Sequence, residues 1–410
     1  MDVRIKPSTL SGSITAIPSK SDAHRLLIAS LLSDESTEIY LPSSSVDIDT
    51  TVMCIKALGA EVTKNGDTLL IKKGSSVNGV TLDCSESGST FRFMVPVASV
   101  LCDKVSFVGH GRLPDRPIKE LLDALRKNGA DFSSDRLPFT KIGKLTSGIF
   151  ELPGNVSSQY ITGLLFALPL LDGDSEIRLT TKLESSAYID ITLWALKRFG
   201  IEIKKDGSSF FIKGNQKYIS PKELKVDGDW SNASYFLASG ATVEGLDINS
   251  PQGDKKILDV FEKMGAEINR DSGISVDTSK LSGCEIDISE IPDTFPTLAV
   301  MATRAEGVTR FVGGARLRIK ESDRIETTAK LLGALGGTVH IYDDGMDVVG
   351  GVLHGGEVDG AGDHRIVMAA AIAGTFATGD VIIHGAEAVS KSYPSFFEDF
   401  EKLGGKYHVI

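Results

Sequence analysis

Basic side chains recur beside predicted helix N-termini along this chain. Lys20 and Arg25 stand in the stretch IPSKSDAHRLLIASLL, where a Pro-Ser start opens an apolar helix. A helix N-terminus already presents unpaired N–H donors and the positive end of the helix dipole, so a cation there is unfavourable unless an anion is bound. Six distant segments share this arrangement, with the residues Lys20, Arg25, Arg92, Arg116, Lys320, Arg324, Arg365 and Lys391. The pattern predicts sites for phosphate or carboxylate groups.

Two carboxylates stand among these cations. Asp293 in EIPDTFPTLAV precedes a Pro-containing helix start, and Glu321 directly follows Lys320. A carboxylate in a basic site can act as a general base or can simply pair with a cation, and the spacing leaves both roles open. Taken one at a time, a cation near a helix start is more often a solvated surface residue. That they meet in one site is therefore a hypothesis.

The opening stretch gives a specific expectation about charge. If the positive charge at Lys20 is unrelieved in the free protein, Lys20→Ala should leave the fold intact or slightly more stable. The same change should greatly reduce turnover.

A repeat organises the elements that must position these residues. An amphipathic helix end, a Gly and a two-stranded hairpin recur, as in CIKALGAEVTKNGDTLLIKKG and ALKRFGIEIKKDGSSFFIKGN. The recurring glycines, about 70 residues apart, are Gly59, Gly129, Gly200, Gly265, Gly336 and Gly404. Each stands where a helix needs a left-handed residue after its C-cap, and Asn-Gly or Asp-Gly turns follow in several copies.

A second, more apolar helix lies between successive copies, as in QYITGLLFALPLL and IVMAAAIAG. Each unit therefore predicts two helices and three or four short strands. Because one helix of each pair is apolar all round, we expect helices inside and sheets outside, the reverse of a TIM barrel. The fold class is α/β, with six repeats of a βαβαββ type.

Composition excludes several classes of function. The net charge of −11 argues against a general binder of nucleic acid or anionic membranes. The four cysteines lack metal or redox spacing, no histidine pair has metal spacing, and no Walker motif or GxSxG occurs. The apolar stretch 161–171 contains a Pro and is shorter than the roughly 18 residues of a membrane span. With no leader-like segment before DVRIKPS, we expect a cytoplasmic protein without a metal.

An ordered set of motifs resembles a known enzyme family. The motifs are SKSDAHR, GSTFR, RLPDRPI, SSQY, AYIDIT, DWSNASYFLA, PDTFPTLAV, KESDRI, GDHRIVMA and KSYPSFF. In this order, from about residue 5 to the C-terminus, they resemble the 5-enolpyruvylshikimate-3-phosphate synthases.

The resemblance implies the enolpyruvyl transferase fold, an inside-out α/β barrel with three repeats in each of two domains. Residues 1–13 and 228–410 would form one domain and residues 14–227 the other, with the active site in the cleft between them. The implied reaction, part of aromatic amino acid biosynthesis, transfers the enolpyruvyl group of phosphoenolpyruvate to the 5-hydroxyl of shikimate 3-phosphate and releases phosphate. No cofactor is implied. The expected partners are these two small molecules, without nucleic acid or membrane, and we expect a monomer.

The resemblance also assigns residues to the two substrates. For shikimate 3-phosphate these are Lys20, Ser21, Arg25, Ser157, Ser158, Gln159, Ser185, Tyr188, Asp293, Arg316 and Lys320. For phosphoenolpyruvate they are Lys20, Gly88, Arg116, Gln159, Arg324, Arg365 and Lys391. It implies Asp293 as the base for the 5-hydroxyl, Glu321 as the acid–base group at the methylene carbon, and Lys20 as a third catalytic residue. Which group moves which proton stays open.

Four positions depart from the commoner bacterial pattern. Glu86 stands where Asn is frequent, Phe93 and Ala187 stand where Pro is frequent, and Arg316 replaces an Asn that contacts the substrate phosphate. These departures bear on inhibitor sensitivity and fine contacts rather than on the reaction.

Two alternatives belong to different classes. A UDP-N-acetylglucosamine enolpyruvyl transferase shares the fold but usually carries a Cys in the loop that here reads GHGRLPDRP, and SSQY fits shikimate phosphate better. A non-catalytic repeat protein that binds phosphorylated ligands would need neither Asp293 nor Glu321. Neutral behaviour of variants at both carboxylates would favour that second alternative.

Overall fold

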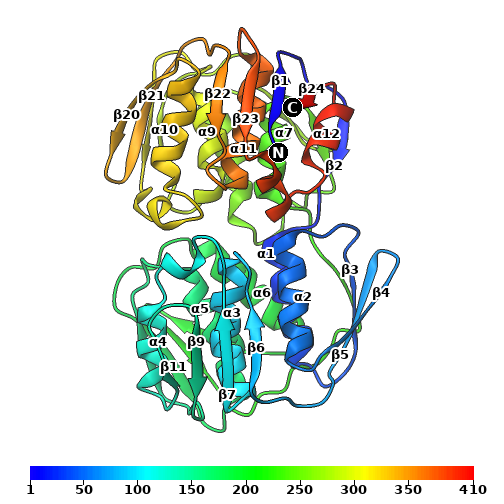
Figure 1. Ribbon diagram of the computed structural model, residues 1–410, viewed down its shortest axis with the longest axis vertical. Helices are drawn as coiled ribbons and strands as arrows, with labels where there is room; N and C mark the ends of the chain where they lie inside the picture. The colour runs from blue at the N-terminus through cyan, green and yellow to red at the C-terminus, as the bar shows by residue number, and fades with distance from the viewer. The chain divides into compact units, whose positions relative to one another are not determined.

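The computed structural model describes all 410 residues and divides into two compact units (Figure 1). Unit 1 comprises Met1–Ile17 and Asp227–Ile410, and unit 2 comprises Pro18–Val226. The first boundary lies beyond the expected position after residue 13, because the strand at Ser13–Thr15 pairs with a strand of unit 1 at Thr242–Glu244. Each unit has its own hydrophobic core.

Unit 2 consists of three βαβαββ repeats. The first repeat contains α1 (Lys20–Leu32), β3 (Thr37–Tyr40), α2 (Val46–Ala57), β4 (Glu61–Asn65) and β5 (Thr68–Lys72). The second contains β6 (Val80–Asp83), α3 (Gly88–Leu101), β7 (Lys104–Val108), η1 (Leu113–Asp115), α4 (Lys119–Arg126), β8 (Asp131–Phe132) and β9 (Phe139–Ile142). The third contains β10 (Ile149–Leu152), α5 (Ser158–Ala167), η2 (Leu168–Leu170), β11 (Ser175–Leu179), α6 (Ser186–Arg198), β12 (Ile203–Asp206) and β13 (Ser209–Ile212). Strand β14 (Glu223–Lys225), at the end of the unit, pairs in parallel with β3 and so completes the first repeat.

Unit 1 repeats the plan. Its first repeat contains β2 (Ser13–Thr15), α7 (Trp230–Ala238), β15 (Thr242–Glu244), η3 (Gly253–Lys256), α8 (Ile257–Lys263), β16 (Glu267–Asn269) and β17 (Ser275–Asp277). The second contains β18 (Glu285–Asp287), η4 (Pro292–Thr294), α9 (Phe295–Ala302), β19 (Val308–Val312), η5 (Ala315–Ile319), α10 (Arg324–Ala334), β20 (Thr338–Tyr342) and β21 (Gly345–Val349). The third contains β22 (Gly356–Asp359), α11 (His364–Phe376), β23 (Val381–His384), η6 (Ala386–Lys391), α12 (Phe396–Lys402), β24 (Lys406–Val409) and, from the far end of the chain, β1 (Val3–Lys6).

The sheets share one order of pairing. In β10-β11-β13-β12, for example, the first pair is parallel and the next two are antiparallel. The sheet completed by β1 follows the same rule, with β1 between β23 and β24. In the first repeat of unit 1 the sheet is interrupted: β2-β15 and β16-β17 are separate pairs joined only by a bridge between Val243 and Ile274.

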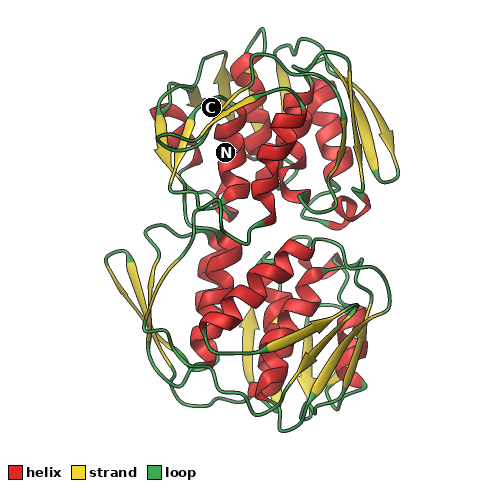
Figure 2. Ribbon diagram, turned by 180° about the vertical axis from the view of Figure 1, so that it is seen from behind, coloured by secondary structure: helices red, strands yellow, loops and turns green.

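The predicted layers are confirmed. Helices α1, α3, α5, α7, α9 and α11 are buried along almost their whole length. Figure 2 shows helices in the middle of each unit and strands toward its outside. The six recurring glycines all have positive φ, from 74° at Gly200 to 97° at Gly59 and Gly404, so each ends its helix as predicted.

Candidate functional site

Lys20 is the first residue of α1 and is paired. Ser19 caps the helix by accepting a hydrogen bond from the Asp22 amide. The Lys20 ammonium lies 2.8 Å from an Asp47 carboxylate oxygen at the start of α2, and the two side chains are only 14% and 11% exposed. The expectation that the charge of Lys20 is unrelieved was therefore wrong, since a neighbouring helix start supplies a carboxylate.

Arg25 ties α1 to α6. Its guanidinium donates to the Thr192 hydroxyl and to the backbone oxygens of Ser21 and Tyr188, and it lies 5.1 Å from the centre of the Phe93 ring. Burial lowers the pKa of Arg25 to about 10. Phe93, one of the departures from the commoner bacterial pattern, thus packs against Arg25, which is predicted to contact shikimate 3-phosphate.

Ser185 precedes α6 in an unusual backbone conformation. Its φ of 52° is left-handed, which costs a non-Gly residue of the order of 1 kcal/mol and is found preferentially at functional sites. The residue is buried, and its carbonyl accepts the Tyr188 amide at 3.1 Å. Another departure, Ala187, is buried in the same turn.

Helices α3 and α5 bring a second group of predicted residues together. Arg92 donates to the Gln159 side-chain oxygen at 2.9 Å, and the Gln159 amide donates to the Ser89 hydroxyl at the same distance. Gly88 lies against the Arg116 guanidinium: a Cβ at this position would be 2.5 Å from one of its nitrogens and would displace that side chain. Ser157 caps α5 through the Gln159 amide.

Side-chain hydrogen bonds also link the helices of unit 2 to one another. The Thr162 hydroxyl on α5 forms a hydrogen bond with the Thr192 hydroxyl on α6, which also accepts a hydrogen bond from Arg25. His24 on α1 bonds Thr51, and Thr51 bonds Thr90 on α3. Burial, with Lys20 and Arg25 nearby, holds the pKa of His24 well below its usual value. Arg25 is therefore linked to α5 and α6, while His24 joins α1 to α2 and α3.

Arg324 is the centre of the predicted site in unit 1. It is 1% exposed, and its guanidinium contacts Asp293 at 2.7 Å, Glu321 at 2.8 Å and Asp363 at 2.9 Å. Burial opposes its charge, but the carboxylates of Asp363, Glu321 and Asp293 outweigh it and raise the pKa of Arg324 well above the ordinary value. Both predicted catalytic carboxylates thus contact one guanidinium.

Asp293 also lies close to two further predicted cations of unit 1. Lys320 lies 3.4 Å from one of its carboxylate oxygens and Arg365 lies 3.6 Å from the other. Burial lowers the pKa of Lys320 despite the opposing effect of Asp293. Arg365 also donates to the Ser231 hydroxyl on α7. Lys391, at the end of η6, instead donates to the backbone oxygen of Gly362, just before α11.

The carboxylates that pair with these cations were not predicted from the sequence. Asp363 is fully buried, accepts from Arg324 and Ser322, and caps α11 through the Arg365 amide. Its position directly before the helix in GDHR is an N-cap signal that was available in the sequence. Asp47 carried no comparable signal, because its partner Lys20 lies on a different helix. Arg316 lies on η5, close enough to lower the pKa of Lys320 by its charge.

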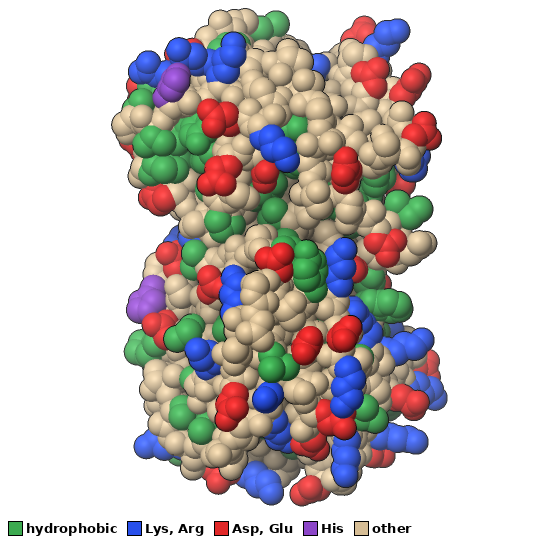
Figure 3. All heavy atoms as spheres, turned by 90° about the vertical axis from the view of Figure 1, so that its right-hand side faces the viewer, with side chains coloured by type: hydrophobic (Ala, Val, Ile, Leu, Met, Phe, Trp, Pro, Cys, Tyr) green, Lys and Arg blue, Asp and Glu red, His purple; other side chains and the backbone are tan.

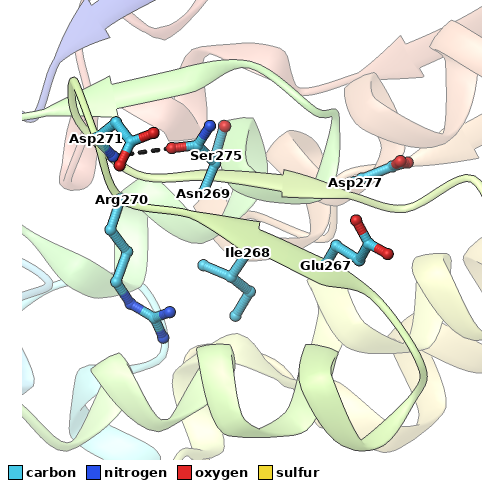
Figure 4. A pocket seen from close by; sticks show the side chains of 7 residues that line it. All are labelled: Glu267, Ile268, Asn269, Arg270, Asp271, Ser275 and Asp277. Atoms are coloured by element: carbon cyan, nitrogen blue, oxygen red, sulfur yellow. Dashed lines mark hydrogen bonds between the residues drawn. The ribbon is translucent and has the colours of Figure 1, made fainter.

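A surface pocket of about 520 Å³ lies elsewhere in unit 1. It is lined by residues of the β16–β17 hairpin, and in Figure 4 the side chains of Arg270 and Ile268 point to the side away from Asp271, Asn269 and Ser275. None of the predicted site residues lines it. The face seen in Figure 3 shows basic and acidic side chains interspersed. None of the helices is long and apolar enough to cross a membrane.

The family model for EPSP synthase (3-phosphoshikimate 1-carboxyvinyltransferase) matches residues 5–400. The chain belongs to this family. It is 45% identical to a 3-phosphoshikimate 1-carboxyvinyltransferase of Clostridium acetobutylicum, over 99% of this chain and 98% of that protein. A 3-phosphoshikimate 1-carboxyvinyltransferase of Clostridium novyi is 43% identical over 98% of each chain.

Solved structures support the fold. The EPSP synthase of Acinetobacter baumannii superposes with a TM-score of 0.82 at 24% identity, over 100% of both chains. The enolpyruvyl transferase NikO of Streptomyces tendae superposes with a TM-score of 0.80 at 17% identity, covering 99% of this chain and 98% of that one. The enolpyruvyl transferase fold expected from the sequence is therefore confirmed.

Proposed function

We propose that the chain transfers the enolpyruvyl group of phosphoenolpyruvate to the 5-hydroxyl of shikimate 3-phosphate and releases phosphate. Membership of the EPSP synthase family supports the reaction. The observation that carries the assignment of residues is the position of Asp293, which lies within 3.6 Å of Lys320, Arg324 and Arg365. A carboxylate among cations stays ionised and can accept a proton, and the same cations can hold phosphate and carboxylate groups.

The proposed sequence of steps is an addition followed by an elimination. In the first step the oxygen of the 5-hydroxyl bonds to the central carbon of phosphoenolpyruvate, and Asp293 accepts the hydroxyl proton. Glu321 or Lys20 protonates the methylene carbon. In the second step the methyl carbon gives a proton back to the group that donated it, and the double bond re-forms. The bond between the central carbon and the phosphate oxygen breaks, and phosphate leaves. Arg324 and Arg365 stabilise the anionic groups throughout, since a guanidinium matches carboxylate and phosphate bidentately.

The proposed site draws on both units. Unit 2 would supply Lys20, Arg25, Gln159 and their neighbours, and unit 1 would supply the residues around Asp293. Two anionic substrates repel each other in water, so we infer that both are held by these cations and that binding excludes water from the reacting groups.

The test is phosphate release from phosphoenolpyruvate with metal chelated, comparing two acceptors. Release that depends on shikimate 3-phosphate alone supports the proposal. Release with UDP-N-acetylglucosamine alone would identify the other transferase. Release with neither acceptor, together with thermal stabilisation by phosphorylated ligands, would favour the non-catalytic binding protein.

A further inference from the structure

Arg318 is a basic residue that the proposed reaction does not use. It lies on η5, two residues before Lys320. Its guanidinium donates three hydrogen bonds, to the Tyr342 carbonyl at 2.7 Å, to the Asp343 carbonyl at 2.8 Å and to an Asp323 carboxylate oxygen at 2.9 Å. Each of its three nitrogens thus donates to an oxygen of the protein.

The three acceptors belong to two different elements. Tyr342 and Asp343 lie where β20 turns into β21, and this hairpin lies beside α10 (Figure 1). Asp323 is the N-cap of α10 and accepts from the Glu326 amide at 3.2 Å. Because a guanidinium is planar, it fixes the directions of several hydrogen bonds at once. Arg318 therefore ties η5 both to the hairpin and to the start of α10.

The segment between Arg318 and α10 carries two predicted site residues, Lys320 and Glu321. Residues 320–323 belong to neither a helix nor a strand, so side-chain contacts must hold them in place. Ser322 is 2% exposed and donates to an Asp363 carboxylate oxygen at 2.9 Å. Lys320 and Glu321 thus lie between two anchored residues, Arg318 and Ser322.

The positions of Lys320 and Glu321 matter because both contact the centre of the predicted site. The Lys320 ammonium lies 3.4 Å from an Asp293 carboxylate oxygen, and a Glu321 carboxylate oxygen lies 2.8 Å from the Arg324 guanidinium. Misplacing a catalytic group by about 1 Å can reduce the rate about 10²-fold. Loss of one anchor would therefore be felt at both contacts.

We propose that Arg318 is a positioning residue that fixes Lys320 and Glu321 in the geometry that turnover requires. It acts through the chain that follows it and through Asp323, and it touches neither substrate nor reacting atoms. The inference rests on the proposed function for the roles of Lys320 and Glu321. The anchoring of the segment itself can be measured without any substrate.

A kinetic test compares Arg318→Met with Arg310→Met. Arg310, on β19 of the same sheet, donates twice to the Asp347 carboxylate at 2.8 Å and lies over the Tyr342 ring, so it controls for the loss of a charged anchor on this hairpin. We expect kcat for shikimate-phosphate-dependent phosphate release to fall on the order of 10- to 100-fold in Arg318→Met. Arg310→Met should retain the kcat of wild type. Equal kcat in the two variants would overturn the inference.

Amide hydrogen exchange separates positioning from a general loss of stability. In Arg318→Met the amides of residues 319–323 should exchange faster than in wild type, because local opening of the segment becomes easier. The amides of the buried helix α11 should change no more than they do in Arg310→Met. Faster exchange throughout unit 1 would show a purely structural role and would overturn the inference.

A second variant, Arg318→Lys, keeps the inference testable if Arg318→Met does not fold. An ammonium keeps the charge beside Asp323 but lacks the fixed fork that serves three acceptors on two elements. We expect kcat and segment exchange between those of wild type and Arg318→Met, and wild-type values of both would contradict the inference. Absence of shikimate-phosphate-dependent phosphate release by wild type would instead contradict the proposed function.

Discussion

Asp293 contacts more cations than the other carboxylates of the site. Asp293→Asn removes the proposed base and leaves Arg324, Lys320 and Arg365 with one fewer counter-charge. We expect kcat to fall on the order of 10² to 10⁴-fold, the usual contribution of a general base. Asp287→Asn, at an exposed position of β18, should retain wild-type turnover. Steady-state kinetics with shikimate 3-phosphate would decide, and equal turnover in the two variants would exclude Asp293 as the base.

Lys20→Ala separates the role of charge from that of structure. Because Lys20 and Asp47 form a largely buried pair, the substitution leaves an uncompensated carboxylate. We expect a loss of about 1–3 kcal/mol in the free energy of unfolding, between the values for exposed and buried pairs, together with a large loss of turnover. Urea unfolding of Lys20→Ala, Asp47→Ala and the double variant would show whether the two losses are coupled. Increased stability of Lys20→Ala would mean that the pair does not form in solution.

Asp254, a buried carboxyl group on η3, should affect how the free energy of unfolding depends on pH. Its pKa is raised from 3.8 to about 7 in the folded protein, so the unfolded chain loses this proton at lower pH than the folded one. Wild type should therefore lose stability relative to Asp254→Asn as the pH rises from about 4 to about 7, by up to about 4 kcal/mol. Urea unfolding at pH 5 and pH 8 measures the difference. A constant difference between the two proteins would show that Asp254 is ionised throughout.

At the scale of elements, a buried ammonium group donates hydrogen bonds to carbonyls at the C-terminal end of the inner helix α3. Lys141 on β9 is fully buried and donates to the carbonyls of Ser99, Cys102 and Gly143 at 2.6 to 2.9 Å. Burial lowers the pKa of Lys141. Lys141→Met should destabilise unit 2 by about 2–4 kcal/mol, because it leaves buried carbonyls without a donor. Chemical unfolding checks this, with Lys144→Met at an exposed position as the control, and equal stability of the two variants would contradict it.

Local signals predicted the elements better than their partners. The six glycines required left-handed backbone after each helix, and they marked the repeat correctly because that requirement is local. The pairs of Lys20 with Asp47 and of Arg324 with Asp363 join different elements, so no spacing along the chain indicates them. Lys141 shows the same limit: its neighbours in the strand read as ordinary alternation, and only the fold brings the end of α3 to its ammonium.

At the scale of the whole molecule, the chain passes between the units after Ile17 and after Val226. The resemblance implied crossings after residues 13 and 227, and neither position could be worked out from periodicity, because three-residue strands such as β2 give almost no periodic signal. Unit 2 is continuous and closes on itself through β14 and β3. Unit 1 depends on the N-terminal segment, since Val3 and Ile5 of β1 are fully buried between β23 and β24.

These differences predict opposite behaviour for the two units when they are separated. The fragment 18–226 should fold alone, because every sheet in it is complete and its core draws on no residue outside it. The fragment 227–410 should fail to fold, because it lacks β1 and β2, and burial of Val3 and Ile5 alone contributes about 1.5–3 kcal/mol each. Cooperative thermal unfolding followed by circular dichroism tests both statements.

Two further fragments make the comparison decisive. Removing β14 as well, in a fragment 18–213, should destabilise unit 2, because β3 then loses its parallel neighbour. Adding a peptide of residues 1–17 to the fragment 227–410 should restore cooperative unfolding, because it supplies the strand between β23 and β24 and the partner of β15. If 227–410 unfolds cooperatively without the peptide, the N-terminal strands contribute little to unit 1, and the chain crossing after Ile17 is not what secures that unit.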